Sequence, residues 1–158
     1  MMPNRILIVE DDTPIRELVT SLLRDAGYDV VTTTNGVAAL EVLQRGEQFE
    51  LIVLDMGLPL MSGRELAQHM AASGIDVPIL VMTAGRDARR AAHDVGAIGY
   101  IAKPFDIDEL ERAVHVALEG SGDVNPRSHF ALPRLRLRRP RLVGDAKAPQ
   151  PLRLRRSF

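Results

Sequence analysis

The sequence predicts an α/β domain built on an open parallel sheet that is covered by helices on both faces. Short apolar runs recur along the first 120 residues, as expected of strands buried on both sides. Between them lie stretches whose apolar residues have helical spacing, and several of these stretches end at glycine. Alternation of strands and helices, with right-handed crossovers, gives parallel strands.

The first strand and helix are expected between residues 6 and 27. Residues 6–9 form an uninterrupted apolar run, Thr13 and Pro14 suit a cap and first turn, and Gly27 supplies the stop. The intervening apolar residues with helical spacing are Ile15, Leu18, Val19, Leu22, Leu23 and Ala26.

A second strand is expected over residues 28–33, which are rich in β-branched side chains. Asn35 and Gly36 then open a helix that ends at Gly46. One face of this helix carries Val37, Leu40 and Leu43.

The third and fourth strands are expected over residues 51–54 and 79–82. Ser62 can cap the helix between them, and Gly74 can end it. Pro78 stands at the start of the fourth strand, where a missing amide donor is tolerated. The apolar positions of the helix include Leu66 and Met70.

The last units are a polar helix over 86–95, a fifth strand over 98–102 and a final helix. Asp106 caps the final helix, whose first turn is acidic in keeping with the helix dipole, and Gly120 lies near its end.

Charge divides the chain into two parts. Residues 1–120 carry 10 Lys and Arg against 19 Asp and Glu, a net charge of −9. Residues 121–158 carry 10 against 2, a net charge of +8, which together give the −1 of the whole chain. The second part also holds five of the ten prolines and lacks a helical apolar period, which is typical of disorder. We therefore expect a folded domain over 4–120 and a basic Arg/Pro-rich tail over 121–158.

Composition excludes several classes of site. The chain has no cysteine, so disulfides, thiolate metal sites and cysteine nucleophiles are ruled out. No apolar stretch approaches the roughly 20 residues needed to span a bilayer. We expect no membrane association and a cytoplasmic protein.

Polar residues stand at the carboxyl ends of four of the five expected strands: Glu10 and Asp11, Asp55, Thr83, and Lys103. These ends meet at one edge of a parallel sheet, where such sheets bind ligands. Three converging carboxylates would repel one another unless a hard divalent cation neutralised them, and oxygen ligands suit Mg²⁺. The sequence therefore predicts a metal-assisted phosphate site.

Four segments occur in order and at intervals that resemble a response-regulator receiver domain: ILIVEDD, LIVLDMGLPLMSG, ILVMTA and GYIAKPF. The resemblance covers about residues 4–119 and is closest to single-domain receivers of the chemotaxis type. It implies a flavodoxin-like three-layer sandwich with a five-stranded parallel sheet in the order 2-1-3-4-5 and five helices. It also implies a role in two-component signalling.

The resemblance implies that Asp55 accepts a phosphoryl group from a phosphohistidine on a sensor histidine kinase or phosphotransfer protein. Asp11, Asp55 and the backbone carbonyl of Gly57 would ligate Mg²⁺ directly, and Glu10 largely through a bound water. Such a domain is a phosphoacceptor switch that assists its own phosphorylation and dephosphorylation, rather than an enzyme with a separate substrate.

The remaining implied roles concern the phosphoryl group and the switch. Lys103, after which the resemblance implies a cis bond to Pro104, would contact the phosphoryl oxygens, and so would the Thr83 hydroxyl. Ala84 would leave room for the phosphoryl group, and Tyr100 would report the switch. The surface that changes would be the fourth helix, fifth strand and fifth helix, where a downstream protein partner would bind.

Some features depart from the winged-helix transcription-factor class of response regulators. Ile98 and Gly99 replace acidic residues common there, and Ala113 stands where that class often has an arginine, so a charge-paired dimer is in doubt. We expect a monomer or a phosphorylation-dependent dimer, with no recognisable DNA-binding domain. For the tail, a solvated remnant is favoured over weak polyanion binding by arginines.

Alternative interpretations remain open at this stage. An aspartyl-phosphate hydrolase of the haloacid-dehalogenase type would have a second Asp where Gly57 stands, and a flavin carrier would need a hydroxyl- and amide-rich loop after the first strand. Taken alone, Asp55 is a strand-end cap, Thr83 satisfies a backbone group and Tyr100 is core. The four histidines have no ligand-like spacing and are expected to be non-catalytic.

Overall fold

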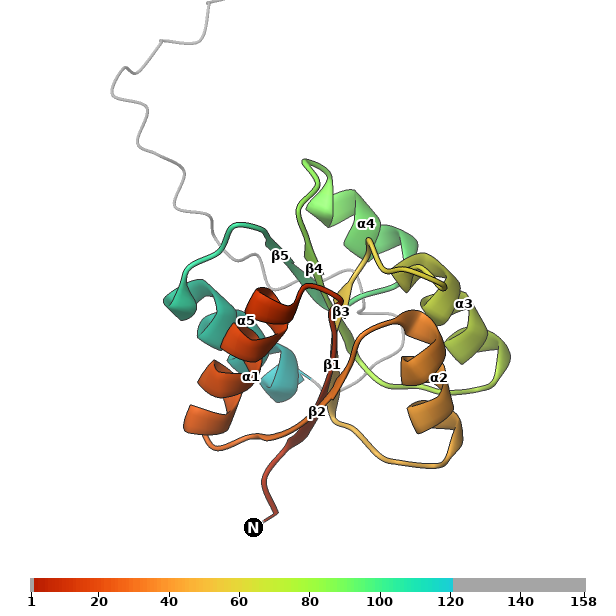
Figure 1. Cartoon of the computed structure of the whole chain (residues 1–158), viewed down its shortest axis with the longest axis horizontal. Coiled ribbons are helices and arrows are strands. Elements are labelled where there is room, and N and C mark those ends of the chain that lie inside the picture. Colours follow the sequence, from red (N-terminus) through yellow and green to blue (C-terminus); the bar gives the residue numbers. More distant parts are fainter. Residues whose placement is uncertain (1, 121–158) are drawn as a thin grey trace, which may run out of the picture.

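A computed structural model describes residues 2–120, which form five strands and five helices in strict alternation (Figure 1). All neighbouring strands are parallel, in the order β2-β1-β3-β4-β5. This confirms the predicted sheet. The elements are β1 (Arg5–Val9), α1 (Thr13–Asp25), β2 (Asp29–Thr33), α2 (Gly36–Gln44), β3 (Leu51–Asp55), α3 (Gly63–Ala72), β4 (Ile79–Thr83), α4 (Ala88–Asp94), β5 (Gly99–Ala102) and α5 (Ile107–Gly120).

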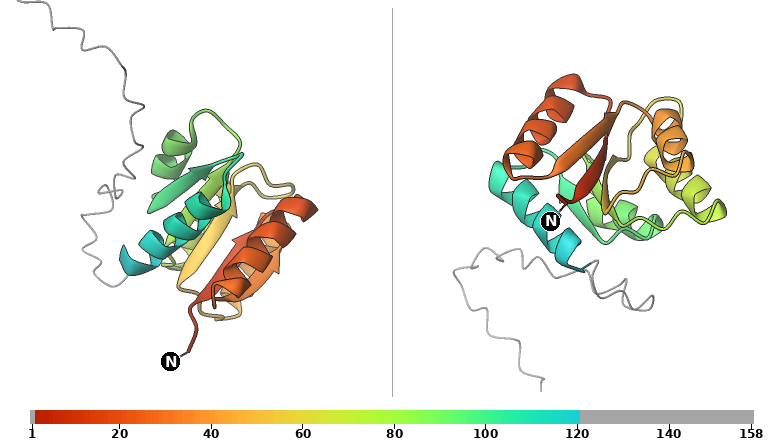
Figure 2. Two further views of the ribbon diagram at one scale, coloured as in Figure 1. Left: turned by 90° about the vertical axis from the view of Figure 1, so that its left-hand side faces the viewer. Right: turned by 90° about the horizontal axis from the view of Figure 1, so that it is seen from below.

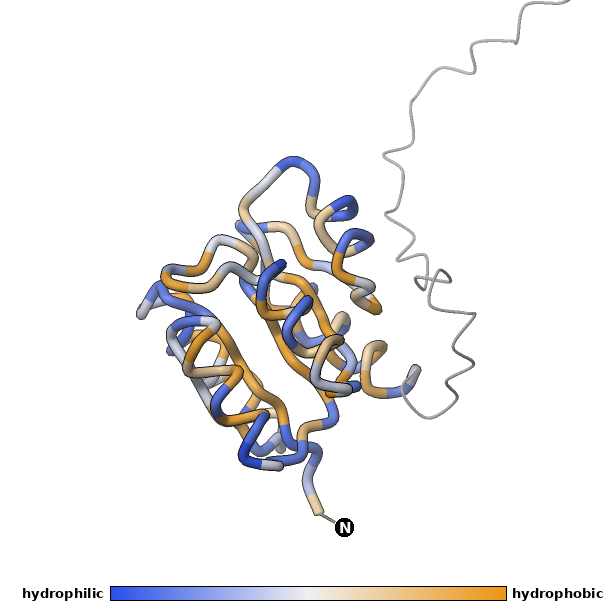
Figure 3. Tube along the Cα trace, turned by 90° about the vertical axis from the view of Figure 1, so that its right-hand side faces the viewer, coloured by the Kyte–Doolittle hydropathy of each residue, from blue (hydrophilic) through white to orange (hydrophobic). Residues whose placement is uncertain are grey.

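The helices lie in two layers, one on each side of the sheet. Helices α1 and α5 cover one face, and α2, α3 and α4 cover the other (Figures 1 and 2). The most hydrophobic segments run through the middle of the molecule, along the strands (Figure 3). The predicted three-layer sandwich is therefore confirmed.

Alternation along each strand divides the core into two clusters. On β1, Ile6 and Ile8 pack with α1 and α5, whereas Leu7 and Val9 pack with α2, α3 and α4. All four side chains have no exposed surface. Burial on both faces explains why the strands are continuous apolar runs.

The first helix corrects one prediction. Its N-cap is Asp12, whose side chain accepts a hydrogen bond from the amide of Ile15, while Thr13 is already helical. A carboxylate is as good a cap as a hydroxyl, and it leaves Pro14 inside the first turn, where its missing amide is harmless. Asp12 is thus a structural cap of α1.

The predicted caps of the third and fifth helices are confirmed. Ser62 and Glu65 form a reciprocal capping box at α3, in which each side chain accepts a hydrogen bond from the backbone amide of the other. These bonds with Ser62 hold the pKa of Glu65 below its ordinary value. At α5, the side chain of Asp106 accepts a hydrogen bond from the amide of Glu109 at 2.8 Å.

Helix α4 is shorter than the predicted 86–95. It begins at Ala88 because Asp87 adopts a non-helical conformation and its side chain makes no capping hydrogen bond. Helix α2 buries Gly36, Ala39 and Leu43, whereas Val37 on its predicted apolar face is 39% exposed. The small residues let α2 approach its neighbours closely, which a pattern of large apolar residues does not reveal.

The expected tail, 121–158, lies outside the described residues. None of the helices between residues 2 and 120 is both long enough and apolar enough to cross a membrane.

Candidate functional site

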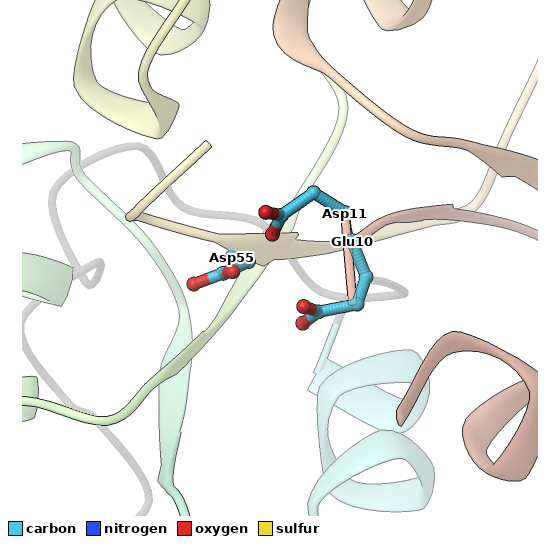
Figure 4. A group of neighbouring side chains, drawn as sticks. All are labelled: Glu10, Asp11 and Asp55. Atoms are coloured by element: carbon cyan, nitrogen blue, oxygen red, sulfur yellow. The ribbon is translucent and has the colours of Figure 1, made fainter. Parts of the chain in front are cut away.

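Three carboxylates meet at the carboxyl edge of the sheet, where β1 and β3 are neighbours. Glu10 and Asp11 follow β1, and Asp55 is the last residue of β3. One oxygen from each lies within 4.8 Å of the others, and their side chains converge in Figure 4. Glu10 is fully buried and Asp55 is 7% exposed, whereas Asp11 is exposed. The predicted convergence is confirmed.

Lys103 brings a positive charge from the end of β5 into this group. Its Nζ lies 2.7 Å from Glu10 Oε2 and 3.4 Å from Asp55 Oδ2. The amide of Lys103 donates to the carbonyl of Thr83 at 2.8 Å, which fixes the strand end beside β4. The Lys103–Pro104 peptide bond is cis, as the sequence resemblance implied.

The buried charges shift one another's proton affinity. Burial raises the pKa of Glu10 above its ordinary value, and the charge of Asp55 adds to this while the hydrogen bond from Lys103 opposes it. Burial alone would lower the pKa of Lys103, but its hydrogen bond to Glu10 and the charge of Asp55 outweigh burial, so its pKa is raised. Lys103 therefore remains protonated and balances the negative charges of Glu10 and Asp55.

Arg16 on α1 supports the acidic pair, a role that the sequence analysis missed. Its guanidinium donates to the backbone carbonyls of Glu10 at 3.1 Å and Asp11 at 3.2 Å. These bonds hold the chain where it leaves β1. Its position in the first helix after the acidic pair was the available signal, because a long side chain there can reach back to the strand end.

The loop after β3 holds Asp55 by close backbone packing. The amide of Gly57 donates to Asp55 Oδ1 at 3.2 Å. A Cβ atom at Gly63 would lie 2.7 Å from the carbonyl oxygen of Asp55, and one at Gly36 would lie 2.5 Å from that of Met61. Both positions therefore require glycine, although neither was predicted as part of the site.

Thr83 and Ala84 lie at the carboxyl end of β4, and Tyr100 lies within β5. Thr83 ends β4 next to Asp55 on β3, since Asp55 pairs in register with Met82. Its side chain is half-buried and Ala84 is exposed. Tyr100 on β5 is half-buried against the core cluster beneath α4.

Comparison with known proteins agrees with this geometry. A family model described as the response regulator receiver domain matches residues 6–115. The chain therefore belongs to the response regulator receiver domain family, the phosphoacceptor switches of two-component systems. It is 36% identical over 116 residues to sporulation initiation phosphotransferase F of Bacillus subtilis, covering 72% of this chain and 93% of that protein.

Other relatives are longer than the matched region. The chain is 40% identical over 112 residues to response regulator MprA of a Mycobacterium species, covering 69% of this chain and 48% of MprA. It is 42% identical over 113 residues to response regulator protein PmrA of Pseudomonas aeruginosa, covering 70% of this chain and 50% of PmrA. The chain thus spans about half the length of these two relatives.

Solved structures show the same fold. The chemotaxis response regulator CheY4 of Vibrio cholerae has a TM-score of 0.67 and 31% identity, covering 73% of this chain and 99% of that one. The response regulator TrrA of Thermotoga maritima, solved in complex with Mg²⁺-BeF, has a TM-score of 0.64 and 33% identity. The match covers 72% of this chain and 98% of TrrA.

Proposed function

We propose that Asp55 accepts a phosphoryl group from a phosphohistidine on a sensor histidine kinase or phosphotransfer protein. A carboxylate oxygen of Asp55 forms the new bond to phosphorus, the phosphorus–nitrogen bond of the donor breaks, and the imidazole nitrogen keeps the electron pair. The observation that carries this proposal is a nearly buried carboxylate with Lys103 Nζ 3.4 Å away and two further carboxylates beside it.

The residues around Asp55 fit Mg²⁺. The cluster offers oxygen donors only, close enough together to share one ion, which suits a hard cation. Both oxygens of Glu10 already accept hydrogen bonds, from the amide of Asp12 and from Lys103, which supports contact through a water. Asp11, Asp55 and the carbonyl of Gly57 would then be the direct protein ligands. When bound, Mg²⁺ would offset the charge of the phosphoryl oxygens.

The other residues of the site act on the transferred group. Lys103 supplies a charge that its flexible side chain can move from Glu10 to the phosphoryl oxygens. The Thr83 hydroxyl donates a hydrogen bond, and Ala84 leaves space. Chemistry of this kind depends on positioning and electrostatics, so the domain assists its own phosphorylation and dephosphorylation without a separate substrate.

Phosphorylation would switch a protein-binding surface formed by α4, β5 and α5, with Thr83 as the link and Tyr100 as the residue that responds. In this proposal residues 4–120 are the receiver domain, and residues 121–158 are a basic appendage with at most weak polyanion binding. The protein acts in the cytoplasm, as a monomer or as a dimer formed on phosphorylation.

Labelling with acetyl phosphate and Mg²⁺ tests the proposal. Wild type should gain one acid-labile phosphoryl group, and Asp55→Asn should gain none, because the amide cannot form the acyl phosphate. A chelator should abolish labelling of wild type. Full labelling of Asp55→Asn, or labelling undiminished by chelator, would disprove the proposed site.

A further inference from the structure

Leu60 is in an unfavourable state by two measures. Its φ is 66°, the only positive value outside glycine among the described residues, and its side chain is 83% exposed. The left-handed region is disfavoured for side chains other than those of Gly, Asn and Asp. Exposure of a large apolar side chain gains no burial energy. Single exposed apolar side chains are ordinary on protein surfaces. The left-handed backbone distinguishes Leu60 from the other large apolar side chains exposed in residues 2–120, which are Met2, Leu18, Val37 and Ile107.

The other large apolar side chains of the loop that contains Leu60 pack against the core. Leu58 is 9% exposed and belongs to the core cluster beneath α2, α3 and α4, and Met56 and Met61 pack against the same cluster. Two backbone hydrogen bonds close the loop. The amide of Gly63 donates to the carbonyl of Met56, and the amide of Met61 donates to the carbonyl of Pro59. Among the four large apolar side chains of this loop, only that of Leu60 points to solvent.

The position of Leu60 relates it to the reaction. The loop begins directly after Asp55, which is 7% exposed. A phosphohistidine must bring its phosphorus to a carboxylate oxygen of Asp55, so the protein that carries it has to cover the edge of the sheet and the loop beside it. A small phosphodonor has no such surface and can reach Asp55 without touching Leu60.

We propose that Leu60 is an apolar docking contact for the phosphohistidine-bearing protein. The inference rests on the proposed function, because it concerns the donor of that same phosphoryl group. Its exposed side chain contacts an apolar surface of the donor and helps to orient the donor over Asp55. It takes no part in the chemistry.

Three substitutions separate docking from structure. Leu60→Gly removes the side chain and relieves the positive φ, Leu60→Ala removes the side chain and keeps the unfavourable φ, and Leu60→Met keeps an apolar contact. Met2→Gly is the matched control, since Met2 is 93% exposed and precedes β1 at the opposite end of the sheet. Each variant is labelled from acetyl phosphate and from the fastest donor in a panel of autophosphorylated histidine kinases.

We expect Leu60→Gly and Leu60→Ala to lose about fivefold or more in kcat/KM with the kinase, the effect of truncating an important interface contact. The loss should lie in KM, because docking acts equally on the ground state and the transition state. Leu60→Met and Met2→Gly should stay close to wild type, and acetyl phosphate should label every variant at the wild-type rate. Leu60→Gly should be at least as stable as wild type and more stable than Leu60→Ala.

Unchanged kinase transfer to Leu60→Gly and Leu60→Ala would overturn the inference. So would equal slowing with the kinase and with acetyl phosphate, since Leu60 would then shape the site itself. Failure of acetyl phosphate to label Asp55 in wild type is a different result, because it removes the proposed function and the inference falls with it.

Discussion

Lys103 holds together charges that would otherwise repel one another. Its ammonium is the cation placed between the buried carboxylates of Glu10 and Asp55, at 2.7 Å and 3.4 Å. Removing one partner of a buried ion pair is costly, because the remaining charge stays desolvated. In the proposed function the same position would suit a contact with phosphoryl oxygens, so one side chain would serve the site before and after modification.

Replacing Lys103 with Met should lower the free energy of unfolding by on the order of 3 kcal/mol without metal. Added Mg²⁺ should restore more stability to this variant than to wild type, because the ion then supplies the missing positive charge. Urea unfolding with and without Mg²⁺ measures both effects. Arg112→Met, which removes an exposed cation of α5, is the control and should show neither.

The lifetime of the phosphoryl group should depend on two glycines beside the site. A Cβ atom at Gly57 would have only Asp55 Oδ1 within 4 Å, and one at Gly85 would contact only the Thr83 hydroxyl and the amide of Asp87. Both positions thus have room for side chains, yet offer none to orient an attacking water. We expect slow self-dephosphorylation.

The double variant Gly57→Asn, Gly85→Glu should shorten this lifetime by about tenfold or more, since an amide and a carboxylate can position water. Loss of acid-labile label after removal of the donor measures it. Gly120→Asn, at the far end of α5, is the control. A wild-type lifetime already shorter than that of the double variant would contradict the argument.

For single residues, the sequence predicted those whose side-chain type, charged or hydroxyl, indicates their chemistry. Glu10, Asp11, Asp55, Thr83 and Lys103 could be placed because each lies at or just after the carboxyl end of a strand, and these ends share one edge of the sheet. Residue type did not predict the roles of Arg16, Gly63 and Leu60, although the position of Arg16 after the acidic pair was a signal for the first. They depend on a hydrogen bond to a carbonyl, on a distance between backbones and on a torsion angle, and residue type specifies none of these.

Strands β4 and β5 connect the site to the surface formed by α4, β5 and α5. They pair from Leu80 with Gly99 to Thr83 with Ala102, so Thr83 and Tyr100 lie within one short ladder. A ligand shifts an equilibrium only if it contacts the two states differently. The Thr83 hydroxyl meets this condition, because a phosphoryl group on Asp55 would attract it and free space near β5.

Thr83→Val keeps the shape of the side chain and removes the hydroxyl. The variant should still accept a phosphoryl group at Asp55, but the response around Tyr100 and α4 should shrink. Amide spectra with and without beryllofluoride measure the response, with wild type as the reference. Full wild-type shifts in Thr83→Val would show that the route is wrong, while the family assignment would stand.

Element boundaries followed the sequence where a single candidate cap or a helix-ending glycine defined them. Ser62 and Asp106 were predicted caps, and the helix-ending glycines Gly27, Gly46, Gly74 and Gly96 all have positive φ. The beginning of α1 was misplaced by one residue because Asp12 and Thr13 are both good caps. The beginning of α4 was misplaced because no side-chain cap exists there.

By composition, the chain joins an acidic part to a basic part. Residues 1–120 have a net charge of −9, and residues 121–158 have a net charge of +8. Within the described residues, α5 buries Leu110, Ala113, Val114 and Ala117, and its last residue is Gly120. Within residues 2–120, all five strands and both layers of helices are in place by the end of α5.

Deleting residues 121–158 should therefore change the free energy of unfolding by less than about 0.5 kcal/mol, the range of changes away from the core. Labelling of Asp55 by acetyl phosphate should also be unchanged. Urea unfolding and labelling of the two proteins measure this. Loss of cooperative unfolding on deletion would show that the appendage packs on the domain.

The close backbone approach at Gly36 and Gly63 means that the position of Asp55 depends on codons that encode no reactive group. A methyl group at Gly63 would meet the backbone of Asp55 and Met56, and one at Gly36 would meet Met61. Backbone cannot rotate away as a side chain can, so the loop itself would have to shift. A single-nucleotide change to alanine at either codon would then behave as a loss-of-function allele, although it leaves every reactive group in the gene product intact.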